Sequence, residues 1–190
     1  MTEIPLHQSN RYEPRKNVNE AAKKLTNVQQ ERAILGLEVL NLALDELNYE
    51  GKSLPLIVFI NDLSVDGTPR VGAFTPKSTK YKRPVIYMDV GDHPATKYFG
   101  EELISHLLQS NHNQDLINKM AIVDTFFEEA NHFIDFTQGI LPKDLDSQGK
   151  IRGFTGEYYD QPHEKRAREF AESMLAKHFT SLVYLKKKLY

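Results

Sequence analysis

The chain has 190 residues, of which 40% are hydrophobic and 26% are charged, and this composition predicts one soluble globular domain with a sizeable core. A formal net charge of -2 gives no reason to expect nucleic acid or an anionic membrane as the main partner. Because the sequence contains no cysteine, disulfides, Cys-ligated zinc, iron–sulfur clusters and thiol catalysis are excluded.

The N-terminal residues 1–17 are expected to form a flexible arm, followed by a single domain over residues 18–190. The arm has no apolar segment of signal-peptide length, and no later segment approaches the ~20 apolar residues of a membrane span. We therefore expect a cytoplasmic protein with no membrane partner. The sequence gives no indication of its oligomeric state.

The first half of the domain predicts a helical region followed by a small sheet. Apolar residues recur at helical spacing over residues 19–49, which indicates one long helix or two helices with a break. Residues 54–60 form a continuous apolar run of strand length, which favours a strand buried on both faces. Further strands are predicted at 71–74 and 84–90, so the expected sheet is mostly three-stranded.

The second half of the domain predicts helices. Helical segments are expected at 94–109 and 114–136, and a polar loop with several glycines is expected at 137–159. A long last helix is expected to begin at Pro162, because proline favours the first helical position, and to continue to the C-terminus. The order of helix, small sheet and further helices predicts an α+β fold.

Residues 124–136, DTFFEEANHFIDF, contain the first candidate site. Glu128 and His132 are four residues apart, so on a helix both project from one face and can hold one ion. Glu129 lies about 100° further round, beside such an ion, where a general base for metal-activated water is needed. The other positions are mostly apolar and indicate a buried helix, whose charged groups must be paired, protonated or bound to a cation. Alternatively, Glu128 and His132 lie on a solvated face or hydrogen-bond each other.

The last helix offers a third candidate residue. Its apolar stripe, extended one turn towards the N-terminus, reaches Glu164. One explanation is helix capping, in which the Glu164 side chain reaches back to the backbone N–H of Gln161. The other is that Glu164 completes a three-ligand metal site with Glu128 and His132, leaving a fourth position for water.

Two phrases, FEEANHFIDF and YYDQPHEKRAREFA, carry a resemblance to a known family. Together with the strand-like segments LPLIVFI and PVIYMDV, they resemble the compact gluzincin-type metallopeptidases of bacteria and their phages, over residues 20–190. The resemblance implies a zincin-like fold, in which a few strands precede an H-E-x-x-H helix and the edge strand lines the substrate cleft. The chain departs from the family because Glu128 occupies the position of the first histidine.

The resemblance also implies a role for each matching residue. Glu129 corresponds to the general base, His132 to the second metal ligand and Glu164 to the third, while Glu128 would replace the first ligand. Further candidates come from the segment before the last helix: a transition-state hydrogen bond from Tyr158 or Tyr159, and an alternate metal ligand in His163.

The implied cofactor is one divalent metal ion, and zinc is the first expectation. Two carboxylates and one imidazole form a harder ligand set than the usual one, which shifts the preference towards manganese or iron(II). The expected function is a metal-dependent hydrolase, a peptidase acting on a peptide or protein substrate. The alternative is a catalytically inactive zincin-like protein that serves as a binding or structural module. A carboxylate-bridged di-iron site is disfavoured, because only one Glu-x-x-His motif is found.

Overall fold

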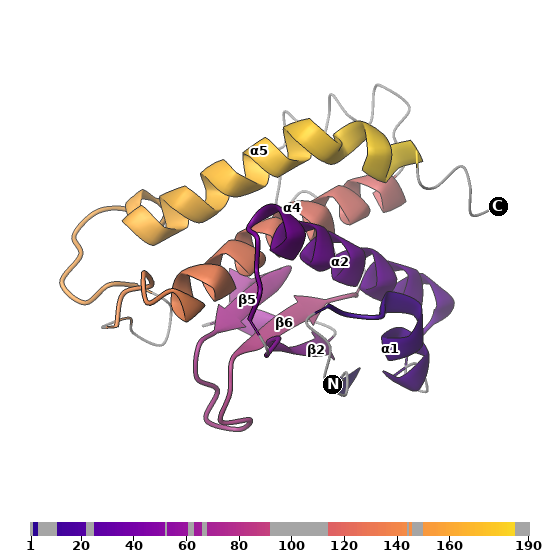
Figure 1. Ribbon diagram of the computed structural model, residues 1–190, viewed down its shortest axis with the longest axis horizontal. Helices are drawn as coiled ribbons and strands as arrows, with labels where there is room; N and C mark the ends of the chain where they lie inside the picture. The colour runs from indigo at the N-terminus through magenta and orange to yellow at the C-terminus, as the bar shows by residue number, and fades with distance from the viewer. Residues whose placement is uncertain are drawn as a thin grey trace.

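The computed structural model describes residues 2–3, 11–21, 25–51, 53–60, 63–65, 68–91, 114–143, 145 and 150–184. These residues form a mixed α+β structure in which the helices cover one face of a small sheet (Figure 1). The fold class predicted from the order of the elements is therefore confirmed at the level of α+β. The helix predicted at 94–109 lies outside the described residues.

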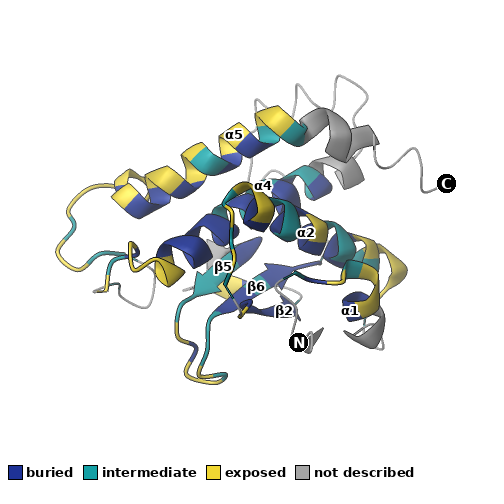
Figure 2. Ribbon diagram, viewed as in Figure 1, coloured by how far each residue is buried: buried dark blue, intermediate teal, exposed yellow. Residues whose placement is uncertain are grey.

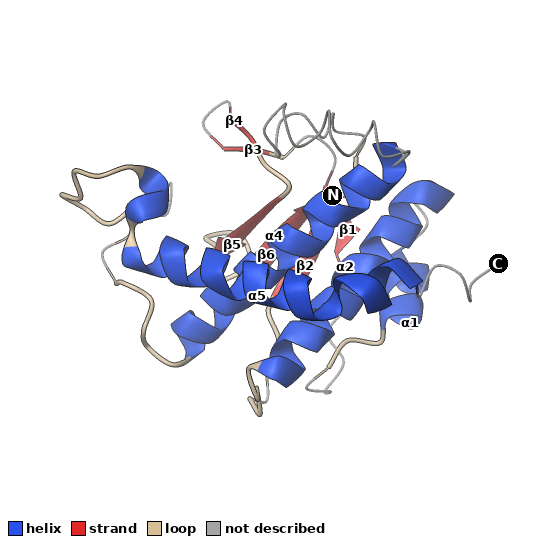
Figure 3. Ribbon diagram, turned by 90° about the horizontal axis from the view of Figure 1, so that it is seen from above, coloured by secondary structure: helices blue, strands red, loops and turns tan. Residues whose placement is uncertain are grey.

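The three predicted strands lie together in one sheet. β2 (Leu56–Ile60) pairs in parallel with β6 (Val85–Asp89), and β5 (Gly72–Thr75) pairs antiparallel with β6. A short strand that was not predicted, β1 (Thr2–Glu3), adds to the other side of β2. The sheet order is β1-β2-β6-β5, so β5 is an outer strand of the described sheet. β3 (Ser64–Val65) pairs antiparallel with β4 (Thr68–Pro69) in a separate two-stranded sheet (Figure 3).

The region predicted as one long helix or two, residues 19–49, contains the end of one helix and all of a second, and the first helix begins within the segment 1–17 that was expected to be an arm. α1 (Pro14–Ala21) is followed by α2 (Asn27–Glu46), which begins after the N-cap residue Thr26. Thr26 and Gln29 form a reciprocal capping box, which satisfies two backbone N–H groups at the start of α2. Part of the segment expected to be an arm contacts the domain, since the Tyr12 hydroxyl donates to the carbonyl oxygen of Pro55 at 2.5 Å.

Two long helices complete the described structure. α4 (Gln114–Thr137) begins where it was predicted to begin, and α5 (Pro162–Tyr184) begins at the predicted proline. A short 3-10 helix, η3 (Tyr158–Asp160), precedes α5 and begins at the end of the predicted loop. α4 lies between the sheet and α5, and α2 packs beside it (Figures 1 and 3). No helix of the described ranges has both the length and the apolarity that a membrane crossing needs.

The core lies between α2, α4 and the sheet, and its burial explains why α4 is apolar on most of its surface. α4 is covered by the sheet and α2 on one side and by α5 on the other, so even its central phenylalanines are fully buried. α5 is instead buried along one side only, the side towards α4 (Figure 2). The largest fully buried side chains of this core are Phe59, Phe126, Phe127, Phe133, Leu37, Leu40, Leu44, Ile57, Ile86 and Met88.

Candidate functional site

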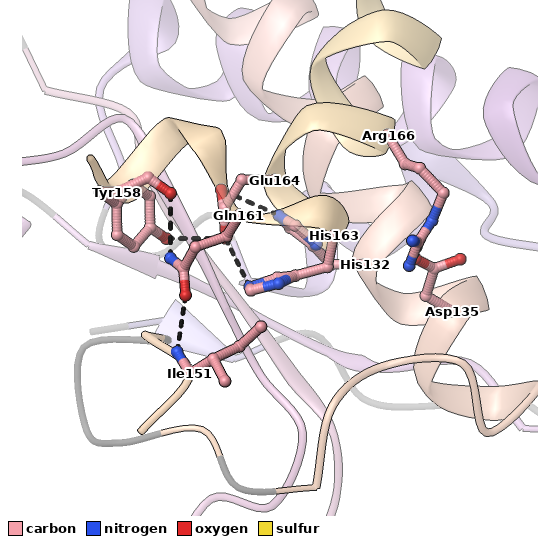
Figure 4. A network of polar contacts seen from close by, with 8 residues as sticks. All are labelled: His132, Asp135, Ile151, Tyr158, Gln161, His163, Glu164 and Arg166. Atoms are coloured by element: carbon pink, nitrogen blue, oxygen red, sulfur yellow. Dashed lines mark hydrogen bonds and ion pairs between the residues drawn. The ribbon is translucent and has the colours of Figure 1, made fainter. Parts of the chain in front are cut away.

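His132 of α4 faces Glu164 of α5 across the contact between these two helices (Figure 4). Their side chains are buried, with 8% of His132 and 6% of Glu164 exposed, and the distance from His132 Nε2 to Glu164 Oε2 is 3.6 Å. The structure thus brings together two of the predicted metal ligands, one from position 132 and one from position 164 of the sequence.

Glu164 is the centre of a polar cluster, which we define as His132, Tyr158, His163 and Glu164. The Tyr158 hydroxyl donates to Glu164 Oε1 at 2.9 Å, and His163 Nε2 lies 3.1 Å from the same oxygen. The N–H of Gln161 donates to the carbonyl of Tyr158 at 3.3 Å, so the capping explanation of Glu164 is wrong. The carboxylate points towards the α4 side chains instead (Figure 4).

The two tyrosines predicted as transition-state donors have different positions. Tyr158 belongs to the polar cluster, whereas Tyr159 is 51% exposed and contacts Tyr158 edge-on, with 5.1 Å between the ring centroids. His163, predicted as an alternate metal ligand, is buried and approaches Glu164 rather than replacing it. Of the three candidates that precede or begin α5, the structure therefore places Tyr158 and His163 in the cluster.

Gln161 holds the cluster in place and was not predicted. Its side chain is fully buried: Oε1 accepts from the N–H of Ile151 at 2.6 Å, and Nε2 donates to the carbonyl of Tyr158 at 3.0 Å (Figure 4). These bonds tie the loop at Ile151 and the first residue of η3 to the residue directly before α5. The only sequence signal for this role is a polar residue directly before the predicted helix start.

Asp135 and Arg166 form a second connection between α4 and α5 that was also missed. Asp135 is buried, and its Oδ2 accepts from Arg166 Nη2 at 2.7 Å and from Nε at 3.2 Å (Figure 4). Asp135 lies three residues after His132, and Arg166 lies two residues after Glu164. This ion pair therefore fixes the same part of the helix contact that brings His132 to Glu164.

Glu129 lies beneath the outer strand β5. Its side chain is 8% exposed and accepts a backbone hydrogen bond from Phe74. The strand can approach because residue 72 is glycine: a Cβ there would lie 2.6 Å from Thr125 Cγ2 and 3.3 Å from Glu129 Cγ. Glu129 is thus held between α4 and β5, next to the polar cluster.

This close approach makes Gly72→Ala a sensitive test of the β5–α4 contact. We expect the added methyl to lower the free energy of unfolding by about 1–3 kcal/mol, because it overlaps the Thr125 methyl. The measurement is urea denaturation, with Gly72→Ala/Thr125→Ser as the matched control that removes the overlapping atom. Unchanged stability in Gly72→Ala, or no recovery in the double variant, would contradict this packing.

Burial changes the acidity of the two adjacent glutamates of α4. Burial, with the nearby carboxylates of Asp124 and Glu129, raises the pKa of Glu128 to about 8. Burial raises the pKa of Glu129 to about 7, although the neighbouring His132 imidazole opposes the shift. Both residues therefore bind protons more readily than an exposed glutamate does.

The pKa of Glu164 is lowered instead of raised. Burial alone would raise its pKa, but the adjacent imidazoles of His132 and His163 outweigh burial and hold the pKa of Glu164 at about 2. Burial alone would lower the pKa of His132, but the contact with Glu164 and the charge of Glu129 raise it overall. Burial and the Glu164 carboxylate raise the pKa of Tyr158. At neutral pH Glu164 is therefore the ionised acceptor of the cluster.

The donor atoms can be compared with the needs of a metal ion. Two donors that are each about 2.1 Å from a tetrahedral ion lie about 3.4 Å apart. The His132–Glu164 separation of 3.6 Å fits this requirement, and His132 Nδ1 is a buried nitrogen with no hydrogen-bond partner among the described residues. Glu128 is near enough to interact electrostatically with both. Within the described ranges, however, no group of three or more His, Asp or Glu side chains is arranged around one point.

Comparisons of the chain with protein-family models, with curated proteins and with solved structures gave no match.

Proposed function

We propose that this chain is a zincin-like, metal-dependent hydrolase of peptide bonds that works in the cytoplasm. The observation that carries the proposal is the meeting of His132 and Glu164 at 3.6 Å, from two helices, with Glu129 buried beside them under β5. Residue types suited to metal binding and to base catalysis thus lie together at the edge of the sheet.

The residues would divide the work between holding a cation and moving a proton. Glu128, His132 and Glu164 would hold the ion, and their mixed oxygen and nitrogen donors suit zinc, manganese or iron(II). The cation would polarise the scissile carbonyl and the attacking water. Glu129 would accept the proton of that water and pass it to the leaving amine. His163 and Tyr158 would orient the Glu164 carboxylate through their contacts with Oε1.

A peptide substrate is favoured by the position of β5. This strand lies at the outer side of the described sheet and passes directly over Glu129. An extended peptide that pairs with such a strand would run past the polar cluster, because strand addition uses main-chain hydrogen bonds.

The second candidate function is the catalytically inactive module. One observation favours it: the Glu164 carboxylate already has three partners, His132, Tyr158 and His163. A buried polar cluster whose central group is satisfied can serve as a helix-to-helix connection without any ion.

Metal content separates the two functions. Protein purified without chelator or affinity metal is analysed for its elements, alongside Glu128→Ala, Glu164→Ala and the control Glu169→Ala, which removes a 63%-exposed carboxylate from α5. We expect about one equivalent of metal in the wild type and in the control, and loss of the metal in the other two variants.

The same proteins are then heated with and without added zinc, manganese or iron(II). A bound ion should raise the melting temperature of the wild type, because it binds the folded state alone. If the wild type takes up none of these ions after incubation, the hydrolase proposal is wrong and the inactive module stands.

A further inference from the structure

Two arginines lie on an aromatic pair next to the polar cluster. The Cζ atom of Arg70 is 5.4 Å from the ring centroid of Tyr158, and the Cζ atom of Arg168 is 5.0 Å from that of Tyr159. The two tyrosine rings contact each other at 5.1 Å, nearly perpendicular. The order is therefore Arg70, Tyr158, Tyr159, Arg168, and we call these four residues the arginine–tyrosine strip.

The strip is assembled from three separate segments. Arg70 follows β4 and comes shortly before β5, where its N–H donates to the carbonyl of Leu63 at 2.9 Å. The tyrosines belong to η3, and Arg168 lies in α5, one turn beyond Glu164. Contact with a flat ring favours an arginine, whose planar guanidinium stacks and still keeps its N–H groups for another partner.

Neither guanidinium has an ion-pair partner within the described residues. The ion pairs described on α4 and α5 involve other groups. Burial raises the pKa of Glu129, Tyr158 and Asp124, and the positive charges partly offset this: that of Arg70 for Glu129 and Tyr158, and that of Arg168 for Asp124. A cation over an aromatic ring keeps its charge, so both arginines retain donors and charge for an anion.

The position of the strip relates it to the proposed cleavage site. The guanidinium of Arg70 lies over the Tyr158 ring, while the hydroxyl of the same residue donates to Glu164. An anion bound by Arg70 would thus be separated from the polar cluster by the ring of Tyr158. A carboxylate suits this place, because its two oxygens match the fork of N–H groups on a guanidinium.

We propose that Arg70, assisted by Arg168, binds a carboxylate of the substrate, so that the protein prefers peptides with an acidic side chain or a free C-terminus at this position. This inference rests on the proposed function, which makes the ligand a peptide. It adds a substrate class to the proposed peptidase activity, namely peptides that present a carboxylate to Arg70.

The test measures binding, using alanine-based peptides with an uncharged BODIPY label and fluorescence anisotropy at low salt. One peptide carries a central Glu pair and an amidated C-terminus, the second a Gln pair and an amidated C-terminus, and the third a Gln pair and a free C-terminus. The full-length chain with Glu129→Gln is used, so that hydrolysis does not consume the probe. Preference for the first peptide identifies a side-chain carboxylate, and preference for the third identifies the C-terminus.

We expect either the first or the third peptide to bind about five- to tenfold more tightly than the second, which has no carboxylate. Adding Arg70→Gln should abolish this preference, Arg168→Gln should reduce it, and Arg70→Lys should keep part of it. The matched control is Lys165→Gln, which removes a 70%-exposed positive charge from the same helix and should leave the preference unchanged.

Equal affinities for the three peptides, or a preference that survives Arg70→Gln, would overturn the inference. These outcomes are distinguishable from failure of the proposed function. If the chain binds no metal but still prefers a carboxylate peptide, only the hydrolase proposal is wrong. If it binds metal and cleaves peptides but has equal affinities for the three peptides, only the inference about the arginine–tyrosine strip is wrong.

Discussion

Glu129→Gln is expected to lower kcat for peptide hydrolysis by about 10²- to 10⁴-fold, the usual contribution of a general base. Glutamine has nearly the same shape as glutamate and still offers an oxygen to the Phe74 backbone, so the packing under Gly72 is retained. It cannot accept the proton of the attacking water. The substitution therefore removes the proton acceptor and keeps the side-chain volume.

The measurement is the rate of cleavage of a quenched fluorescent peptide library, combined with the metal content of each protein. The control Glu157→Gln makes the same change at an exposed position close to η3, and it should retain the wild-type rate. Full activity in Glu129→Gln would remove this residue from the mechanism. Loss of metal together with activity would make Glu129 a ligand rather than a base.

Phe126→Ala is expected to lower the free energy of unfolding by about 3–5 kcal/mol, because a fully buried phenylalanine leaves a cavity when it is truncated. Phe126 packs against α2 where residue 36 is glycine, and a Cβ at that position would lie 3.4 Å from Phe126 Cε1. The close contact leaves little freedom for α2 and α4 to collapse into the space. The cavity should therefore remain largely open.

Urea denaturation measures this effect, and an unchanged slope m would show that the unfolded state is the same. Phe136→Ala is the matched control, since it makes the same truncation on the same helix at a side chain that is 38% exposed. Phe136 contacts Phe74 at 6.0 Å between ring centroids, so we expect a loss of about 1 kcal/mol there. Similar losses in the two variants would contradict the assignment of Phe126 to the centre of the core.

The sequence predicted the elements that depend on local pattern. Apolar runs of strand length gave β2 and β6, and a proline at the helix start gave the first residue of α5. The i, i+4 relation of Glu128 and His132 also follows from helix geometry alone. Local periodicity contains these features, because each of them depends on neighbours within a few positions.

The contacts between distant segments were harder to predict. Periodicity could not decide whether Glu164 caps its own helix or faces α4, since both explanations use the same position in the first turn. The tertiary structure decides it through His132. The pairs Asp135–Arg166 and Ile151–Gln161 were missed for the same reason, because charged and polar residues in such positions are common on solvated surfaces.

The strand order has a consequence for how the chain folds. β6 lies between β2 and β5, although β5 precedes β6 in the sequence. The antiparallel β5–β6 pair needs only a short loop closure, whereas the parallel β2–β6 pair closes a longer one at a greater entropic cost. Pairing of β5 with β6 is thus the less costly first step. Gly72 would then arrive as part of a preformed hairpin, so that the strand over Glu129 meets α4 already paired with β6.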